Sequence, residues 1–318
     1  MNKERIFIDF HCHPTLKPFG KSFPERKHAS NRNRKNSIWH DDRPNIFEKG
    51  LNYLAGLTKF KQSDMSTLAE GGAICISAAL YPPEQGFFKP LEIEGRSADL
   101  ITDLVTGLSV KRIDYIQSHE SYFKDLEEEY KFLKALEGKV YKVGREKYTY
   151  KIVNSYSEVE ALSRPSEVHT IGIFLSIEGL HVLNCGMEEA ADRSEVMKNV
   201  RALKEWENRI FFVTFAHHFY NELAGHARSL DKTMSKFIDQ GPGTETGFTD
   251  LGKEVLHELL EDESGKPIFI DVKHMNVRSR REYYNILKEE YSEKKIPIIV
   301  SHGAVTGYFD EREKEAIP

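Results

Sequence analysis

The sequence predicts an α/β fold with a parallel sheet, and two observations carry this prediction. Six short runs of apolar and β-branched residues recur at wide intervals, at 6–10, 73–80, 170–177, 210–215, 267–272 and 296–300. Almost every position in each run is apolar, as expected for strands that are buried on both faces of a parallel sheet. Segments with helical spacing of apolar residues separate the runs, so strands and helices alternate along the chain.

The expected helices are marked by their ends and by their apolar stripes. Residues 63–64 form a helix start signal, and Gly71 and Gly72 end the helix before the second strand. Apolar stripes predict further helices at 100–108 and 123–133, with a break near Ser109, and at 196–203, 249–260 and 283–291. Strand–helix–strand connections in a parallel sheet are right-handed, so this order predicts successive βα units.

A closed (β/α) barrel needs eight βα units, and about six are visible in this chain. We therefore expect a TIM-like (β/α) barrel that is either open or truncated at its C-terminus. The whole chain, residues 1–318, is expected to form one domain. Two segments interrupt the βα order: an irregular insertion at about 14–60 and a small hairpin at about 139–154.

The composition excludes several classes of protein. The net charge of −5 gives no general attraction to nucleic acid or to an anionic membrane, and no run is long enough to span a bilayer. Three cysteines match no disulfide scaffold, and the N-terminus lacks the apolar stretch of a signal peptide. We expect a soluble, cytoplasmic protein that acts on a small molecule, and the sequence leaves a homodimer open.

Side chains that bind metals follow most of the expected strands. In strand order they are His11 and His13, Glu178, His217 and His218, His274, and His302. Residues two apart in an extended chain share a face, so the first two imidazoles point the same way. The carboxyl ends of the strands in a parallel barrel face one mouth, so these side chains are expected to converge.

Some of these residues have a second interpretation. If the fourth strand continues, His217 and His218 cannot both point inward, and one of them would be structural. Each of the other candidates could be a polar residue where a strand meets a loop. Asp9 and Asp271 precede ligands by two or three positions. They could orient an imidazole, with an ordinary polar strand position as the equal alternative.

Four histidines and one carboxylate form a donor set for zinc or a similar divalent ion. Five donors exceed one tetrahedral site but suit two ions, held about 3.5–4 Å apart by a bridging Glu178. Two ions would lower the pKa of a shared water from about 16 to roughly neutral. The resulting metal-bridging hydroxide, beside a polarised carbonyl, predicts a hydrolase.

Seven segments of the chain form a recognisable series of motifs. They are a first-strand motif at 8–14, a helix into the second strand at 63–72, a glutamate segment at 176–180, a Leu-Thr-x-x-His-like strand at 213–217, a helix start at 247–252 and two histidine motifs at 271–274 and 300–302. In this order they resemble the membrane (renal) dipeptidase family of the amidohydrolase superfamily.

The resemblance implies a (β/α) barrel with a binuclear zinc site and dipeptides as substrates. The implied metal ligands are His11 and His13 for one ion, His274 and His302 for the other, and Glu178 for both. His217 would contact the substrate or the tetrahedral intermediate, and Arg312 would bind the substrate carboxylate.

Two departures from the family pattern bear on function. His13 stands where the family has an aspartate, and the family's late-strand aspartate, which assists proton transfer, would lie beyond residue 318. A metal-dependent phosphoesterase or lactonase on the same barrel stays open, with Lys273 as the only cation beside a ligand. A non-catalytic, truncated relative also stays open. The first hypothesis is a binuclear metal-dependent hydrolase that cleaves the amide bond of dipeptides or similar small amides.

Overall fold

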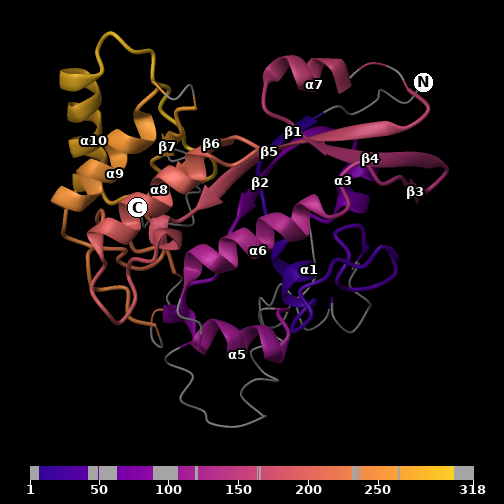
Figure 1. Cartoon of the computed structure of the whole chain (residues 1–318), viewed down its shortest axis with the longest axis horizontal. Helices are drawn as coiled ribbons and strands as arrows, with labels where there is room; N and C mark the ends of the chain where they lie inside the picture. The colour runs from indigo at the N-terminus through magenta and orange to yellow at the C-terminus, as the bar shows by residue number, and fades with distance from the viewer. Residues whose placement is uncertain are drawn as a thin grey trace, which may run out of the picture.

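The computed structural model describes residues 7–41, 49, 63–88, 107–118, 121–162, 164, 166–230, 235, 238–263 and 266–303. The strands of these residues are β1 (Phe7–Cys12), β2 (Ala73–Leu80), β3 (Tyr141–Val143), β4 (Glu146–Ile152), β5 (His169–Glu178), β6 (Ile210–Thr214) and β7 (Phe269–Asp271). The α-helices are α1 (Leu16–Gly20), α3 (Met65–Gly71), α5 (Val110–Ser118), α6 (Tyr122–Lys134), α7 (Tyr156–Leu162), α8 (Arg193–Lys204), α9 (Asp250–Leu260) and α10 (Val277–Glu290). Figure 1 shows their arrangement.

The strands form one sheet in which parallel pairing dominates. Strands β1, β2, β5, β6 and β7 follow one another in this order, and each neighbouring pair is parallel. Strand β4 is parallel to the first half of β5, and β3 is antiparallel to β4 in a hairpin. A parallel bridge from Asp271 to Ile299 brings the last expected strand against β7. The predicted α/β fold with a mainly parallel sheet is therefore confirmed.

The sheet is strongly curved, because side chains of strands that are not neighbours meet on one face. Phe10 of β1 stacks on Phe212 of β6 with ring centroids 5.4 Å apart, although β2 and β5 lie between them in the strand order. Phe174 of β5 packs against Phe10 at 5.5 Å. Layers of side chains from several strands fill curved parallel sheets in this way.

The curved sheet does not close. Within the described residues, no pairing joins β1 to residues 296–300. Ile8 and Val300, at the two edges, remain 51% and 59% exposed. An open sheet, one of the two expected forms, describes these residues, and a closed TIM barrel is not shown.

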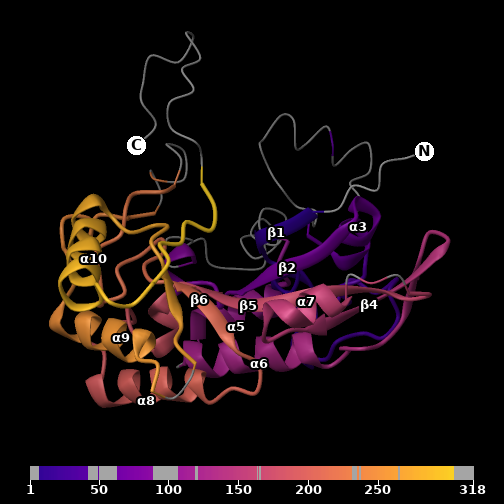
Figure 2. The ribbon, with the colours of Figure 1, turned by 90° about the horizontal axis from the view of Figure 1, so that it is seen from above.

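Helices α6, α8 and α9 cover one face of the sheet (Figure 2). The apolar stripes that predicted them are buried, for example Leu126 and Leu133, Val196 and Val200, and Val255 and Leu259. The predicted start and end of α3 are also confirmed. Asp64 accepts a hydrogen bond from the backbone N–H of Thr67 at 2.9 Å, and Gly72 ends α3 with a φ of 84°.

The described part of the expected insertion, residues 14–41, packs into the molecule. Trp39 is fully buried, and Phe19 and Phe23 lie against the guanidinium group of Arg112 in α5. Arg112 in turn makes two hydrogen bonds of 2.6 Å to Asp125 of α6. These contacts hold the segment against both helices. Apart from residue 49, residues 42–60 lie outside the described part of the chain.

The described residues include neither a membrane-spanning helix nor a reactive cysteine. No helix in the described ranges has both the length and the apolar composition to cross a bilayer. Cys12, Cys75 and Cys185 are free and buried. Burial raises the pKa of each thiol, to about 11 for Cys75. None of the three has the lowered pKa of a nucleophilic thiolate.

Candidate metal centre

The carboxyl ends of the parallel strands deliver the predicted ligands to one place. Each ligand lies in a strand or within three residues of a strand end or of the bridge at Ile299: His11, His13, Glu178, His217, His274 and His302. Parallel strands end at a common edge of the sheet, so side chains at these positions converge.

Two local backbone features aim the side chains. Gly179, directly after Glu178, has a φ of 91°, and a methyl group there would overlap the His181 ring and lie 3.0 Å from Cβ of His217. His274 adopts a φ of 64°. This left-handed conformation is unfavourable for a residue with a side chain, and it persists at functional sites where the surrounding structure enforces it.

Glu178 lies at the centre of the group and is only 4% exposed. Nε2 of His13 is 2.9 Å from its Oε2 atom, and Nε2 of His11 is 3.4 Å from its Oε1 atom. The Nε2 atoms of three further rings approach Oε1, those of His217 at 3.5 Å, His302 at 3.5 Å and His274 at 3.7 Å. A buried carboxylate needs compensating positive charge. The rings can supply it by carrying protons or by holding cations.

The donors form two groups that share Glu178. One contains His11, His13 and Glu178, and the other contains Glu178, His274 and His302. The donor atoms of each group lie within 4.8 Å of one another. These clusters could hold metal ions, and they divide the histidines in the way that the dipeptidase resemblance implies.

The hydrogen bonds around the rings fit metal binding. Nδ1 of His13 donates to the carbonyl of Ala79 at 2.9 Å, and Nδ1 of His302 lies 2.9 Å from Oγ of Ser301, so both Nε2 atoms face the centre. Nε2 of His302 and Nε2 of His274 lie 3.3 Å apart. If His274 carries its proton on Nε2, this contact is a hydrogen bond to His302; if both rings are protonated on Nδ1, two lone pairs face each other and a cation can bind between them.

Glu178, His274 and His302 all have lowered pKa values. Burial raises the pKa of Glu178, but the imidazoles of His217 and His13 outweigh burial and hold this pKa well below its ordinary value. Burial and the neighbouring His11 lower the pKa of His302 to about 3, and burial also lowers the pKa of His274. The carboxylate is therefore ionised and these two rings are neutral, as metal ligands must be.

Glu84 is a buried member of this centre that the sequence interpretation missed. Its Oε2 atom accepts a hydrogen bond from Nδ1 of His217 at 2.7 Å and from the Tyr81 hydroxyl at 2.9 Å. Its Oε1 atom accepts from the backbone N–H groups of His218 and Phe219 at 3.2 and 3.3 Å. Glu84 lies just beyond β2, and a search of every strand end for carboxylates could have found it.

Glu84 fixes the orientation and the charge of His217. Because Nδ1 of His217 is bound to Glu84, its Nε2 atom faces Glu178 at 3.5 Å. Burial lowers the pKa of His217, but the carboxylates of Glu84 and Glu178 outweigh burial and raise this pKa to about 10. At neutral pH the ring therefore presents an Nε2–H group to the centre.

His217 and His218 both face the cluster. Their ring centroids lie 4.0 Å apart, and the His218 ring is also 4.9 Å from that of His274. The expectation that only one could do so, if the strand continued, does not apply because β6 ends at Thr214. Beyond that residue the alternation of a strand no longer sets the direction of each side chain.

Asp9 and Asp271 do not bind imidazoles directly. Asp9 accepts a hydrogen bond from the backbone N–H of His11 at 3.0 Å. Asp271 accepts the Ser301 hydroxyl at 2.6 Å, and Ser301 contacts Nδ1 of His302. Asp271 therefore acts on His302 through a serine, whereas Asp9 shapes the backbone.

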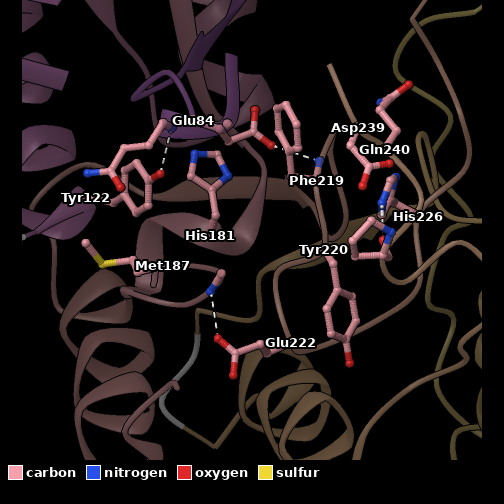
Figure 3. A pocket seen from close by; sticks show the side chains of 14 residues that line it. Glu84, Tyr122, His181, Met187, Phe219, Tyr220, Glu222, His226, Asp239 and Gln240 are labelled. Carbon is pink, nitrogen blue, oxygen red and sulfur yellow. Dashed lines mark hydrogen bonds between the residues drawn. The ribbon is translucent and has the colours of Figure 1, made fainter. Parts of the chain in front are cut away.

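A pocket borders the centre at Glu84, and Figure 3 shows the side chains that line it. Its cavity volume of about 410 Å³ suits a small organic ligand. The described lining has no lysine or arginine, and it combines carboxylates with aromatic rings: Glu84, Glu222, Asp239, Tyr122, Phe219 and Tyr220. Arg312, the expected partner of a substrate carboxylate, lies outside the described residues.

Comparisons with known proteins assign no family to this chain. No protein-family model matches it. No curated protein matches it either.

Proposed function

We propose that this chain is a binuclear metal-dependent hydrolase that cleaves the amide bond of dipeptides or similar small amides. One observation carries the proposal: the buried carboxylate of Glu178 meets five imidazole nitrogens at 2.9–3.7 Å. Imidazole and carboxylate are ligands of zinc, and a shared carboxylate is suited to a pair of ions.

The proposed ions would each have two histidine ligands and would share Glu178. His11 and His13 would hold one ion, and His274 and His302 the other. When bound, two zinc ions supply Lewis acidity and lower the pKa of a water held between them. The ionised Glu178 offsets part of their charge, which favours cation binding at a largely buried position.

His217 is the proposed donor to the carbonyl oxygen, which gains negative charge when the amide is attacked. Its Nε2 atom faces the centre, and the Glu84 carboxylate at Nδ1 raises the pKa of the ring, which favours a proton on Nε2. Glu84 is a positioning residue that holds the ring through Nδ1. Removal of one fixed oxyanion donor costs about 2.7–4 kcal/mol of barrier in other enzymes.

The pocket beside the centre, whose lining includes Glu84 but none of the proposed metal ligands, supports an amide over a phosphoester. Phosphate groups are bound by arginine and lysine, and the described lining contains neither, whereas Glu84, Glu222 and Asp239 contribute carboxylates. These acids suit the ammonium group of a dipeptide. Arg312 is proposed to bind the carboxylate at the other end of the substrate.

We also propose that the curved sheet belongs to a TIM-like (β/α) barrel of the dipeptidase type. The stacking of Phe10 on Phe212 and of His11 on His302 supports this curvature. The order of the dipeptidase-like motifs along the chain supports the family assignment.

Hydrolysis assays after controlled metal loading test the proposed function. The full chain is stripped with a chelator, reloaded with zinc and offered dipeptides, a phosphate monoester and a lactone. We expect dipeptide hydrolysis that disappears on chelation and returns with about two zinc ions per chain.

The other outcomes separate the alternatives. Turnover of the phosphate monoester or the lactone without dipeptide hydrolysis would support the second enzyme class. Zinc binding without turnover of any of these substrates would contradict the proposal and support a non-catalytic protein.

A further inference from the structure

A third group of donors lies beside the two that share Glu178. It consists of His217, His218 and His274, whose donor nitrogens lie within 4.8 Å of one another. The ring centroids are 4.0 Å apart for the first pair, 4.9 Å for His218 and His274, and 4.7 Å for His217 and His274. Unlike the other two groups, this one contains no carboxylate.

His218 is held by contacts to its ring and to its backbone. Its Nδ1 atom lies 2.6 Å from Oγ of Ser229. Its backbone N–H donates to Glu84 at 3.2 Å, and its carbonyl accepts from Nε2 of Gln240 at 2.8 Å. A ring whose Nδ1 atom is engaged in this way offers Nε2 as its ligand atom. The proposed amide hydrolysis makes no use of this histidine.

We infer that His217, His218 and His274 form a third divalent-cation position next to the two groups centred on Glu178. The inference rests on the proposed function, because the third position is defined relative to those two sites. Three imidazoles and a water make a tetrahedral donor set that zinc accepts. The set lacks a negative charge to offset the cation, so it is expected to fill after the two groups that contain Glu178.

A cation in the third position would compete with the proposed reaction. It would displace the Nε2 proton of His217, which then could not donate to the substrate, and it would withdraw His274 from its group with Glu178 and His302. The first equivalents of metal are therefore expected to activate the enzyme, and an excess is expected to inhibit it.

Titration of the chelator-stripped full chain with cobalt(II) tests this inference. Bound cobalt is measured by equilibrium dialysis with mass spectrometry, and the visible absorption of the bound ion is followed in parallel. In the wild type we expect about two cobalt ions per chain to bind tightly and one more to bind weakly. In His218→Ala we expect loss of the weakly bound equivalent alone. Ser229→Ala removes the contact to Nδ1 together with a 3.4 Å hydrogen bond from Nε2 of Gln240, so it should weaken this equivalent by roughly tenfold.

His169→Ala is the matched control, because His169 is an exposed histidine at the start of β5. It should bind cobalt like the wild type. Zinc inhibition gives a second readout, since the ratio of the rate in excess zinc to the rate in stoichiometric zinc should rise towards one in His218→Ala.

Three outcomes would overturn the third position. Survival of the weaker equivalent in His218→Ala would remove His218 from it. A wild-type chain that binds only the tight equivalents would overturn it and leave the proposed function intact. A wild-type chain that binds no cobalt tightly would overturn both.

Discussion

The rings of His11 and His302 stack with centroids 4.0 Å apart, although they belong to the two open edges of the sheet. His11 lies in β1, at one end of the strand order, and His302 follows the bridge to β7 at the other end. Glu178, from the middle of the order, is 3.4 and 3.5 Å from their Nε2 atoms. Among the described residues, the curvature of the sheet therefore assembles the centre without a closed ring of backbone pairing.

Glu84→Gln should slow turnover while the metal content stays near that of the wild type. The substitution removes a carboxylate that raises the pKa of His217, so this pKa should fall towards its ordinary value of 6.5. We expect kcat to fall by about 10²-fold, with a smaller change in KM. The alkaline limb of the pH–rate profile should move to lower pH.

Tyr81→Phe is the control for Glu84→Gln. It removes a hydroxyl that donates to Glu84 at 2.9 Å but leaves the charge of the carboxylate in place. The alkaline limb should therefore move much less. An unchanged alkaline limb in Glu84→Gln would mean that Glu84 does not set the protonation of His217.

The metal-free protein should lose stability as pH rises from about 6.5 to about 10. Because the folded pKa of His217 is raised to about 10 from an ordinary 6.5, the folded state keeps a proton that the unfolded state releases in this window. The contribution is complete below pH 6.5 and is lost as pH rises through about 10. Urea unfolding in the presence of a chelator measures this slope, which should be flatter in His217→Gln. Equal slopes for the two proteins would rule out a raised pKa at His217.

Asp125→Ala should destabilise the fold by about 3–5 kcal/mol, because it leaves the guanidinium group of Arg112 buried without its partner. Adding Arg112→Met should recover part of the loss, since the double variant no longer buries an unpaired charge. Urea unfolding of both variants measures the two effects. A loss below about 1 kcal/mol in Asp125→Ala, in the range of exposed ion pairs, would count against this account of the pair.

Gly179→Ala should disturb metal binding as well as stability. Gly179 and Gly138 have φ angles of 91° and 77°, so alanine at either position should cost about 1–2 kcal/mol of backbone strain. Only at Gly179 would the methyl group meet the His181 ring and Cβ of His217, because it has no neighbour within 4 Å at Gly138. Calorimetric titration with zinc should therefore distinguish the two variants. Equal zinc affinities would show that the turn after Glu178 does not constrain the centre.

The sequence predicted the central strands better than the last one. The apolar run at 73–80 forms β2 over the same residues, since this strand is paired on both sides. The run at 296–300 makes only a bridge at Ile299 within the described residues. A strand at an open edge pairs on one side only. The apolar pattern does not show whether a second neighbouring strand is present.

The candidate metal centre was predictable where its side chains follow strands, and not where they come from loops. His13, Glu178 and His302 could be placed from the spacing of the apolar runs, because parallel strands share an edge. The contacts of Glu84 with His217 and of Ser229 with His218 join loops distant in sequence. Local patterns do not fix such loop positions, which depend on tertiary packing.

The metal content of Glu178→Gln tests the central claim most directly. Wild type, Glu178→Gln and the control Glu129→Gln are loaded with zinc, dialysed and analysed by mass spectrometry. Glu129 is also a buried carboxyl, but it bonds to Thr15 and Tyr81 rather than to the histidines. We expect about two zinc ions per chain in the wild type and in the control, and a large loss of zinc and of hydrolysis in Glu178→Gln. Near-normal zinc content and rate in Glu178→Gln would contradict the claim that this carboxylate joins two metal sites.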